Sequence, residues 1–163
     1  MRALVLLLVA APALAKPPEG TAAEAEALVA ALIRPNADVA ALSKQLKPSH
    51  ADYVAVFDPE TAAKIETLLS PAWAAGQIIV RANPGQTDVR VFRATVEELR
   101  SGAAAAANFP GGYRQVAPHI LPGIVVFAFK FTAPGQPLGM AYDGLVFVNG
   151  HWALFPKPWR ALR

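Results

Sequence analysis

The stretch Met140-Ala-Tyr-Asp-Gly-Leu-Val-Phe-Val-Asn-Gly-His-Trp-Ala-Leu-Phe155 contains two apolar segments separated by Asn149-Gly150. Asn-Gly between two such segments is typical of a two-residue type I′ hairpin turn, because both residues adopt positive φ at little cost. A two-residue loop also fixes which residues face each other across the hairpin. The sequence therefore predicts three cross-strand pairs: Val148 with His151, Phe147 with Trp152 and Leu145 with Leu154.

A second strong strand pattern precedes this hairpin at residues 124–132, Ile-Val-Val-Phe-Ala-Phe-Lys-Phe-Thr. Both faces of this segment are apolar, so the strand is covered on both sides or lines a cavity on one side. Weaker patterns predict strands at 78–81, 89–93 and 113–120. The last of these contains Pro118 and would therefore lie at a sheet edge.

Helix signals dominate the first half of the chain. Capping boxes begin at Thr21 and Thr95, and Asp58-Pro59 marks another helix start. Asn36 is expected to cap a short helix that ends before Pro48, and 52–57 favours a helical turn. With helices first and strands afterwards, we expect an α+β fold in which N-terminal helices pack on a curved antiparallel sheet.

The N-terminus has the features of a secretory signal peptide. Apolar residues 3–15 lie between Arg2 and Lys16 and end in Ala13-Leu14-Ala15, a small-residue cleavage site. The run is shorter than the roughly 20 residues that span a membrane. We therefore predict a signal peptide at 1–15, a short linker at 16–20 and a single α+β domain at 21–163. Cleavage after Ala15 would deliver the protein to the periplasm or the medium.

Composition limits the chemistry that the domain can perform. The chain has 15 basic and 12 acidic residues and no cysteine. Its basic residues are scattered, which argues against nucleic-acid binding, and no second long apolar segment predicts a membrane anchor. Without cysteine there is no lipoprotein anchor, disulfide or thiolate metal site, and the three histidines have no metal-ligand spacing. No motif implies a cofactor.

The order of elements and the hairpin from Asp143 to Trp152 resemble the cystatin-like cone fold of nuclear transport factor two, ketosteroid isomerase and scytalone dehydratase. That resemblance implies a pocket at the open end of a bent sheet, but no particular function. The segments 52–57, 109–112 and 155–160 are also similar to those of an uncharacterised family of small exported bacterial proteins. This second resemblance implies no activity.

Two residues are candidate catalytic groups. Strict alternation places Asp143 on the same face as Leu145 and Phe147, where a carboxyl group could act as a general base. Alternatively, it hydrogen-bonds to backbone amides or pairs with an arginine such as Arg160. His119 could donate a proton at a pocket mouth or could be an ordinary surface residue.

Aromatic and basic side chains near the C-terminus are candidate ligand contacts. Tyr113, Tyr142 and Trp159 could line an apolar pocket or simply fill the core. Lys157, Trp159 and Arg160 could bind an anionic or aromatic group, or this segment could clamp the C-terminus onto the sheet with Arg160 paired to Asp143, which we favour. We therefore expect an exported, non-enzymatic module that binds a small apolar ligand or a protein partner. The alternative is an isomerase or dehydratase that uses Asp143 and His119 in one pocket.

Overall fold

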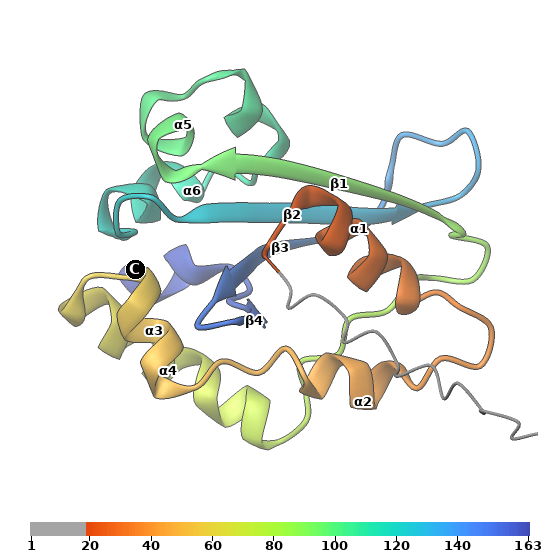
Figure 1. Cartoon of the computed structure of the whole chain (residues 1–163), viewed down its shortest axis with the longest axis horizontal. Coiled ribbons are helices and arrows are strands. Elements are labelled where there is room, and N and C mark those ends of the chain that lie inside the picture. The colour runs from red at the N-terminus through yellow and green to blue at the C-terminus, as the bar shows by residue number, and fades with distance from the viewer. Residues whose placement is uncertain (1–18) are drawn as a thin grey trace, which may run out of the picture.

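A computed structural model describes residues 19–163 (Figure 1). The predicted signal peptide, 1–15, and most of the predicted linker lie outside the described residues. The elements follow in the order α1 (Ala22–Ala31), α2 (Val39–Lys44), α3 (His50–Val56), α4 (Pro59–Ala74), β1 (Asp88–Thr95), α5 (Val96–Ser101), η1 (Ala104–Asn108), α6 (Tyr113–Val116), η2 (Ala117–His119), β2 (Val125–Thr132), β3 (Gly139–Val148), β4 (His151–Leu154) and η3 (Pro158–Leu162), where η denotes a 3₁₀ helix.

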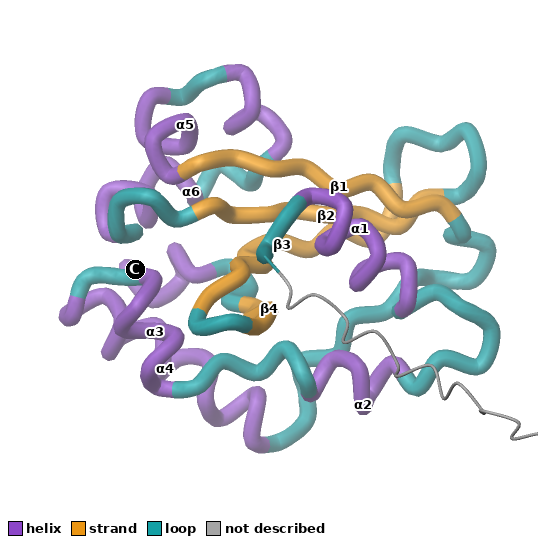
Figure 2. The backbone as a smooth tube through the Cα atoms, in the orientation of Figure 1, coloured by secondary structure: helices purple, strands orange, loops and turns teal. Residues whose placement is uncertain are grey.

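The four strands form one antiparallel sheet in the order β1-β2-β3-β4 (Figure 2). In Figure 1, α1 lies in front of the sheet, and α2, α3 and α4 lie below it. The sheet is open and the helices pack on it, which confirms the predicted α+β class. The cystatin-like cone stays a prediction.

The β3–β4 hairpin forms as its sequence predicts. All three expected cross-strand pairs are present, together with the pair Val146–Ala153. Asn149 and Gly150 both have positive φ, 49° and 79°, as the two-residue turn requires.

The hairpin turn is held to α3 by a buried carboxylate. Asp52 is 1 % exposed, and its oxygens lie 2.7 Å from Asn149 Nδ2 and 2.9 Å from His151 Nε2. Ser49, the N-cap of α3, donates its backbone N–H and its hydroxyl to Asp52 Oδ2 at 2.7 and 2.8 Å. Asp52 therefore joins residues almost a hundred positions apart in the chain.

Two predicted strands are wrong. Residues 78–81 are irregular, and residues 113–120 form α6 and η2. Tyr113, Val116, Ala117 and Ile120 are all buried, and this i, i+3, i+4, i+7 spacing is that of a helix, not of a strand. Pro118 is accommodated at the first turn of η2, where its missing N–H costs little.

The N-cap of α2 is also corrected. Asp38, and not Asn36, accepts a hydrogen bond from the backbone N–H of Ala41, at 3.0 Å. Asn36 instead adopts a left-handed conformation with φ of 63°, which asparagine tolerates better than most residues.

A bulge interrupts β3 at Asp143 and Gly144. Phe127 pairs with Leu145 whereas Phe129 pairs with Tyr142, so two residues of β3 lie opposite Ala128 alone. Gly144 has φ of 81°, which favours glycine. Because of the extra residue, Tyr142 takes the face of Leu145. The prediction that Asp143 shares that face is therefore wrong.

The buried residues belong to one core that includes helices and sheet. Among residues 19–163, no helix is both long and apolar enough to cross a membrane.

Candidate ligand site at the β3 bulge

The bulge turns the Asp143 side chain towards α6 and the C-terminal segment. Only 5 % of Asp143 is exposed. Its Oδ1 accepts two hydrogen bonds, from the Tyr113 hydroxyl at 3.2 Å and from the Lys157 backbone N–H at 2.9 Å. Its Oδ2 accepts none from the described residues, yet it is not sealed from solvent. One oxygen thus holds the carboxyl in place while the other is available to a ligand.

Tyr113 is fixed by aromatic neighbours. Its ring centroid lies 5.2 Å from that of Phe109 and 5.2 Å from that of Trp159. Trp159 approaches the backbone so closely that a Cβ on Gly112 would lie 2.3 Å from the indole ring. The glycine of the Phe109–Gly112 turn therefore allows Trp159 to pack on Tyr113. The segment after β4 is clamped to the sheet by this packing.

Lys157 reaches Asp143 through its backbone. After Pro156 the chain turns sharply, and Lys157 has φ of 51°, in the left-handed region that L residues seldom adopt. In this conformation the Lys157 N–H donates its hydrogen bond to Asp143 Oδ1. The side chains of Lys157 and Arg160 are exposed. Among residues 19–163, no ion pair includes Asp143, so the expected pairing with Arg160 is absent.

The electrostatics of Asp143 follow from this burial. Desolvation raises the pKa of the Asp143 carboxyl above its ordinary value of 3.8. The Lys157 N–H, the Tyr113 hydroxyl and the charges of Lys157 and Arg160 each oppose that rise without cancelling it. Burial likewise raises the pKa of Tyr113, which stays a neutral hydrogen-bond donor.

Two clefts meet at this carboxyl. One, which we call the α4 cleft, has a volume of about 520 Å³ and includes aliphatic side chains of α4, of Ile78 and Ile79 and of β3. The other, the β2 cleft, has a volume of about 510 Å³ and includes residues of β2 and of the Phe109–Pro110 turn. Both clefts are lined by Ala141, Tyr142, Asp143 and Lys157. Arg160 lines the α4 cleft, and Lys130 lines the β2 cleft.

Tyr142 stiffens the wall between the two clefts. Its ring stacks on Phe129, with centroids 5.3 Å apart and planes 20° apart. Its hydroxyl accepts from the Arg81 N–H at 2.9 Å and donates to the Arg81 carbonyl at 2.8 Å. The hydroxyl therefore already donates one hydrogen bond and accepts another within the protein. The part of Tyr142 that remains for contact with a ligand is its aromatic ring.

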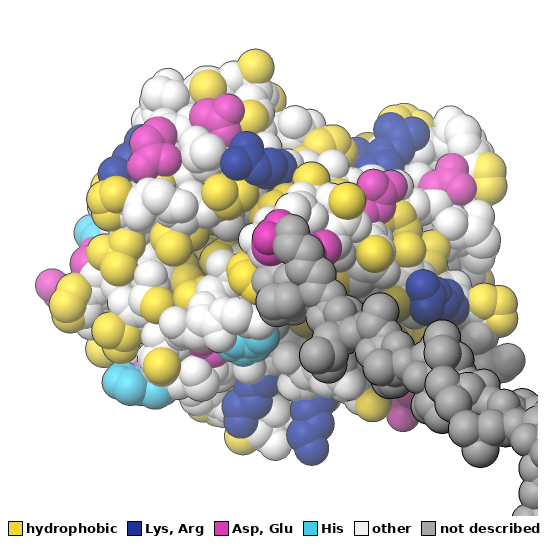
Figure 3. Space-filling model, viewed as in Figure 1, with side chains coloured by type: hydrophobic (Ala, Val, Ile, Leu, Met, Phe, Trp, Pro, Cys, Tyr) yellow, Lys and Arg dark blue, Asp and Glu magenta, His cyan; other side chains and the backbone are white. Residues whose placement is uncertain are grey.

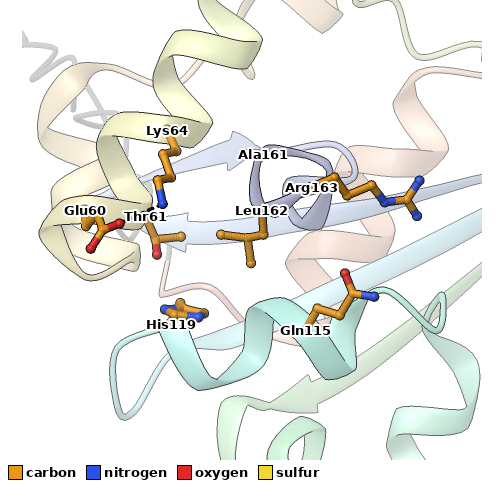
Figure 4. Close-up of a pocket in the computed structure, with 8 residues that line it drawn as sticks. All are labelled: Glu60, Thr61, Lys64, Gln115, His119, Ala161, Leu162 and Arg163. Atoms are coloured by element: carbon orange, nitrogen blue, oxygen red, sulfur yellow. Dashed lines mark hydrogen bonds and ion pairs between the residues drawn. The ribbon is translucent and has the colours of Figure 1, made fainter.

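His119 belongs to a different place. Its Nδ1 lies 2.8 Å from Asp58 Oδ2, and Asp58 is itself the N-cap of α4. The cavity that His119 lines has a volume of about 550 Å³, with Thr61, Leu162 and Arg163 among its walls, and does not include Asp143 (Figure 4). The structure therefore does not bring the two candidate catalytic residues to one cavity.

Five of the six sequence candidates do gather near the bulge: Tyr113, Tyr142, Asp143, Trp159 and Arg160. Sequence reasoning grouped Lys157 with Trp159 and Arg160, but it did not predict that the Lys157 backbone N–H would hold Asp143. It also missed the apolar wall formed by Leu68, Ile78 and Ile79, because no sequence pattern relates α4 to β3.

On the face of the molecule seen in Figure 3, basic, acidic and apolar side chains are interspersed.

Within residues 19–163, no three histidine, aspartate or glutamate side chains are grouped so that they could hold a metal ion. Comparison with protein-family models, curated proteins and solved structures finds no match for this chain.

Proposed function

We propose that this chain is an exported, non-enzymatic domain that binds a small ligand with an apolar body at the two clefts beside Asp143. The observation that carries the proposal is the Asp143 carboxyl, which is almost fully buried and has one oxygen without a partner among residues 19–163. This oxygen is not sealed from solvent, so a ligand in the clefts can reach it. A ligand donor at Oδ2 would supply a hydrogen bond that the described residues do not.

The dimensions and chemistry of the clefts support this proposal. Volumes of about 520 and 510 Å³ fall within the roughly 300–1,000 Å³ typical of small-molecule sites. Most of the lining is apolar, with a few polar groups that could fix the orientation of a ligand. The clamp formed by Trp159 and Tyr113 holds the site in a defined geometry before a ligand arrives.

A thermal-shift screen of metabolites and lipids tests the proposal. Ala141 is exposed and lines both clefts, so Ala141→Trp should fill them without disturbing the core. Ala63→Trp is the matched control, because Ala63 is exposed on α4 outside both clefts. A compound at 100 times its Kd should add about 2.7 kcal/mol to the stability of the unsubstituted protein and of Ala63→Trp. Equal stabilisation of Ala141→Trp, or no stabilising compound, would contradict the proposal.

An isomerase or dehydratase is the second candidate. The raised pKa of Asp143 beside the Tyr113 hydroxyl favours it, since a carboxyl group tuned upwards can exchange protons with a substrate. Its weakness is the separate location of His119. If it holds, Asp143→Asn should bind the stabilising compound found in the screen but should no longer convert it.

Export is part of the proposed function and depends on residues 1–15. Amino-terminal sequencing of the protein secreted by a bacterial host should begin at Lys16. Retention of Met1 would contradict it.

A further inference from the structure

The charges around the two clefts indicate which class of ligand the site prefers. The α4 cleft contains one carboxyl, Asp143, and two cations, Lys157 and Arg160. The β2 cleft contains the same carboxyl with Lys130 and Lys157. Each cleft therefore carries a formal excess of one positive charge when Asp143 is ionised, and of two when it is neutral. Such a surface attracts anions and repels cations.

The α4 cleft also has a long aliphatic wall. Leu68 and Leu69 come from α4, and Ile78 and Ile79 from the segment that follows it. Leu68 is 43 % exposed, one of few large apolar side chains left so open among the described residues. An apolar ligand chain that lay along this wall would bury Leu68, and burial of apolar surface is favourable by roughly 25 cal/mol per Å².

The two cations of the α4 cleft, Lys157 and Arg160, are available to a ligand. Lys157 uses its backbone N–H to hold Asp143, which leaves its exposed ammonium group available, and among the described residues neither Lys157 nor Arg160 forms an ion pair. A guanidinium group binds carboxylates in a bidentate way. A carboxylate placed between these cations can also share a proton with Asp143 Oδ2.

We infer that the ligand is an amphipathic carboxylate, with its head group between Asp143, Lys157 and Arg160 and its aliphatic tail along Leu68, Ile78 and Ile79. This inference rests on the proposed ligand-binding function and names its ligand class. Bound in this way, the head group would occupy the point where the two clefts meet. The tail would cover the apolar wall of the α4 cleft.

Three probes that share a ten-carbon chain, decanoate, decanol and decyltrimethylammonium, test this assignment by calorimetric titration of the full chain. Decanoate should bind at least tenfold more tightly than either of the others. Arg160→Gln and Lys157→Gln should each weaken decanoate binding by about two- to fivefold, the range expected for partly exposed charge pairs. Arg93→Gln is the control, since Arg93 is exposed on β1 and lines neither cleft.

The dependence on pH gives a second readout. Groups facing Asp143 are Tyr113 from α6, Lys157 and Arg160 from the C-terminal segment and Lys130 from β2. Burial raises the pKa of Tyr113, so its hydroxyl stays neutral below pH 8. Decanoate should bind more tightly as pH falls towards the raised pKa of Asp143, because the carboxyl then loses its repelling charge. Asp143→Asn should remove this dependence and keep the tighter binding.

The outcomes separate the inference from the proposed function. If decanol or the cation binds as tightly as decanoate, the carboxylate assignment is overturned while the ligand site stands. If none of the three binds, the assignment is also overturned, and the screen with Ala141→Trp decides separately whether the site binds any ligand. Decanoate binding that is unchanged in both Lys157→Gln and Arg160→Gln would likewise overturn it.

Discussion

Two aspartates are buried in this domain, and their surroundings differ in one decisive respect. Asp52 and Asp143 are 1 % and 5 % exposed. Both oxygens of Asp52 accept hydrogen bonds, from Ser49, Asn149 and His151. In Asp143, Oδ1 alone accepts hydrogen bonds from residues 19–163. Two carboxyl groups that are similarly buried therefore differ in role. Asp52 holds the hairpin turn to α3, whereas Asp143 has one oxygen available to a ligand.

The two pKa values record the same difference. Burial alone would raise the pKa of Asp52, but hydrogen bonds from Ser49, Asn149 and His151 outweigh burial and hold it below 3.8. At Asp143 burial is the larger effect, and the pKa lies above 3.8. A buried carboxylate that stabilises the fold has protein hydrogen bonds to both oxygens. A buried carboxyl that has them at one oxygen only is a candidate for function.

The largest expected effect comes from adding a side chain to Gly144, in the bulge that sets Asp143 apart from Asp52. In Gly144→Ala, the new Cβ would lie 2.0 Å from the Phe155 carbonyl oxygen, at a φ of 81°. We expect a loss of more than about 3 kcal/mol in unfolding free energy, measured by urea denaturation. Gly150→Ala is the control, because Gly150 has φ of 79° but no atoms within 4 Å of the added Cβ, and it should lose only about 1 kcal/mol. Equal losses would show that the contact with Phe155 is unimportant.

Replacing each aspartate by asparagine sharpens the comparison next. Asp52→Asn replaces an accepting oxygen by an amide that cannot accept, and should lose about 2–3 kcal/mol at pH 7. Asp143→Asn keeps an oxygen for Tyr113 and Lys157 and removes a poorly solvated charge, so its stability should change by less than about 1 kcal/mol. Urea denaturation of both variants measures the difference. If Asp143→Asn is the more destabilised, the assignment of the two roles is wrong.

The smallest expected effect is the opposite dependence of the two variants on pH. The folded-state pKa of Asp52 is lowered, so its contribution is complete above 3.8 and is lost as pH falls below that value. The folded-state pKa of Asp143 is raised, so ionisation costs stability as pH rises from 3.8 through the raised value. The deficit of Asp52→Asn should therefore shrink below pH 4, whereas Asp143→Asn should become more stable relative to the unsubstituted protein as pH rises above 4. Parallel pH profiles of the two variants would contradict this prediction.

Local signals predicted local structure well. The Asn149-Gly150 turn fixed the hairpin register, and the capping boxes at Thr21 and Thr95 are both formed as expected. Each depends on contacts among residues at most a few positions apart along the chain or across a two-residue loop. Residues 113–120 show the limit of local signals, because β-branched and aromatic residues that suit a strand also occupy the helical spacing that α6 and η2 adopt.

Most residues of the candidate site could be predicted from the sequence, but their arrangement in space could not. Five candidate residues gather at the bulge because the C-terminal segment folds back onto α6 and β3. His119 instead meets Asp58, sixty-one positions away, through the packing of η2 against the start of α4. No pattern in the sequence states which distant residue a side chain will reach.

By itself the sequence determined the α+β class, the hairpin and most helix ends, because those depend on nearby residues and on hydrophobic period. The tertiary structure alone decided that both oxygens of Asp52 accept hydrogen bonds, whereas Oδ2 of Asp143 accepts none from residues 19–163. A single extra residue in β3, at Gly144, reversed the face of Asp143. The partners of Asp52 and Asp143 come from segments distant in the chain, so their number at each oxygen is settled only when the whole domain packs.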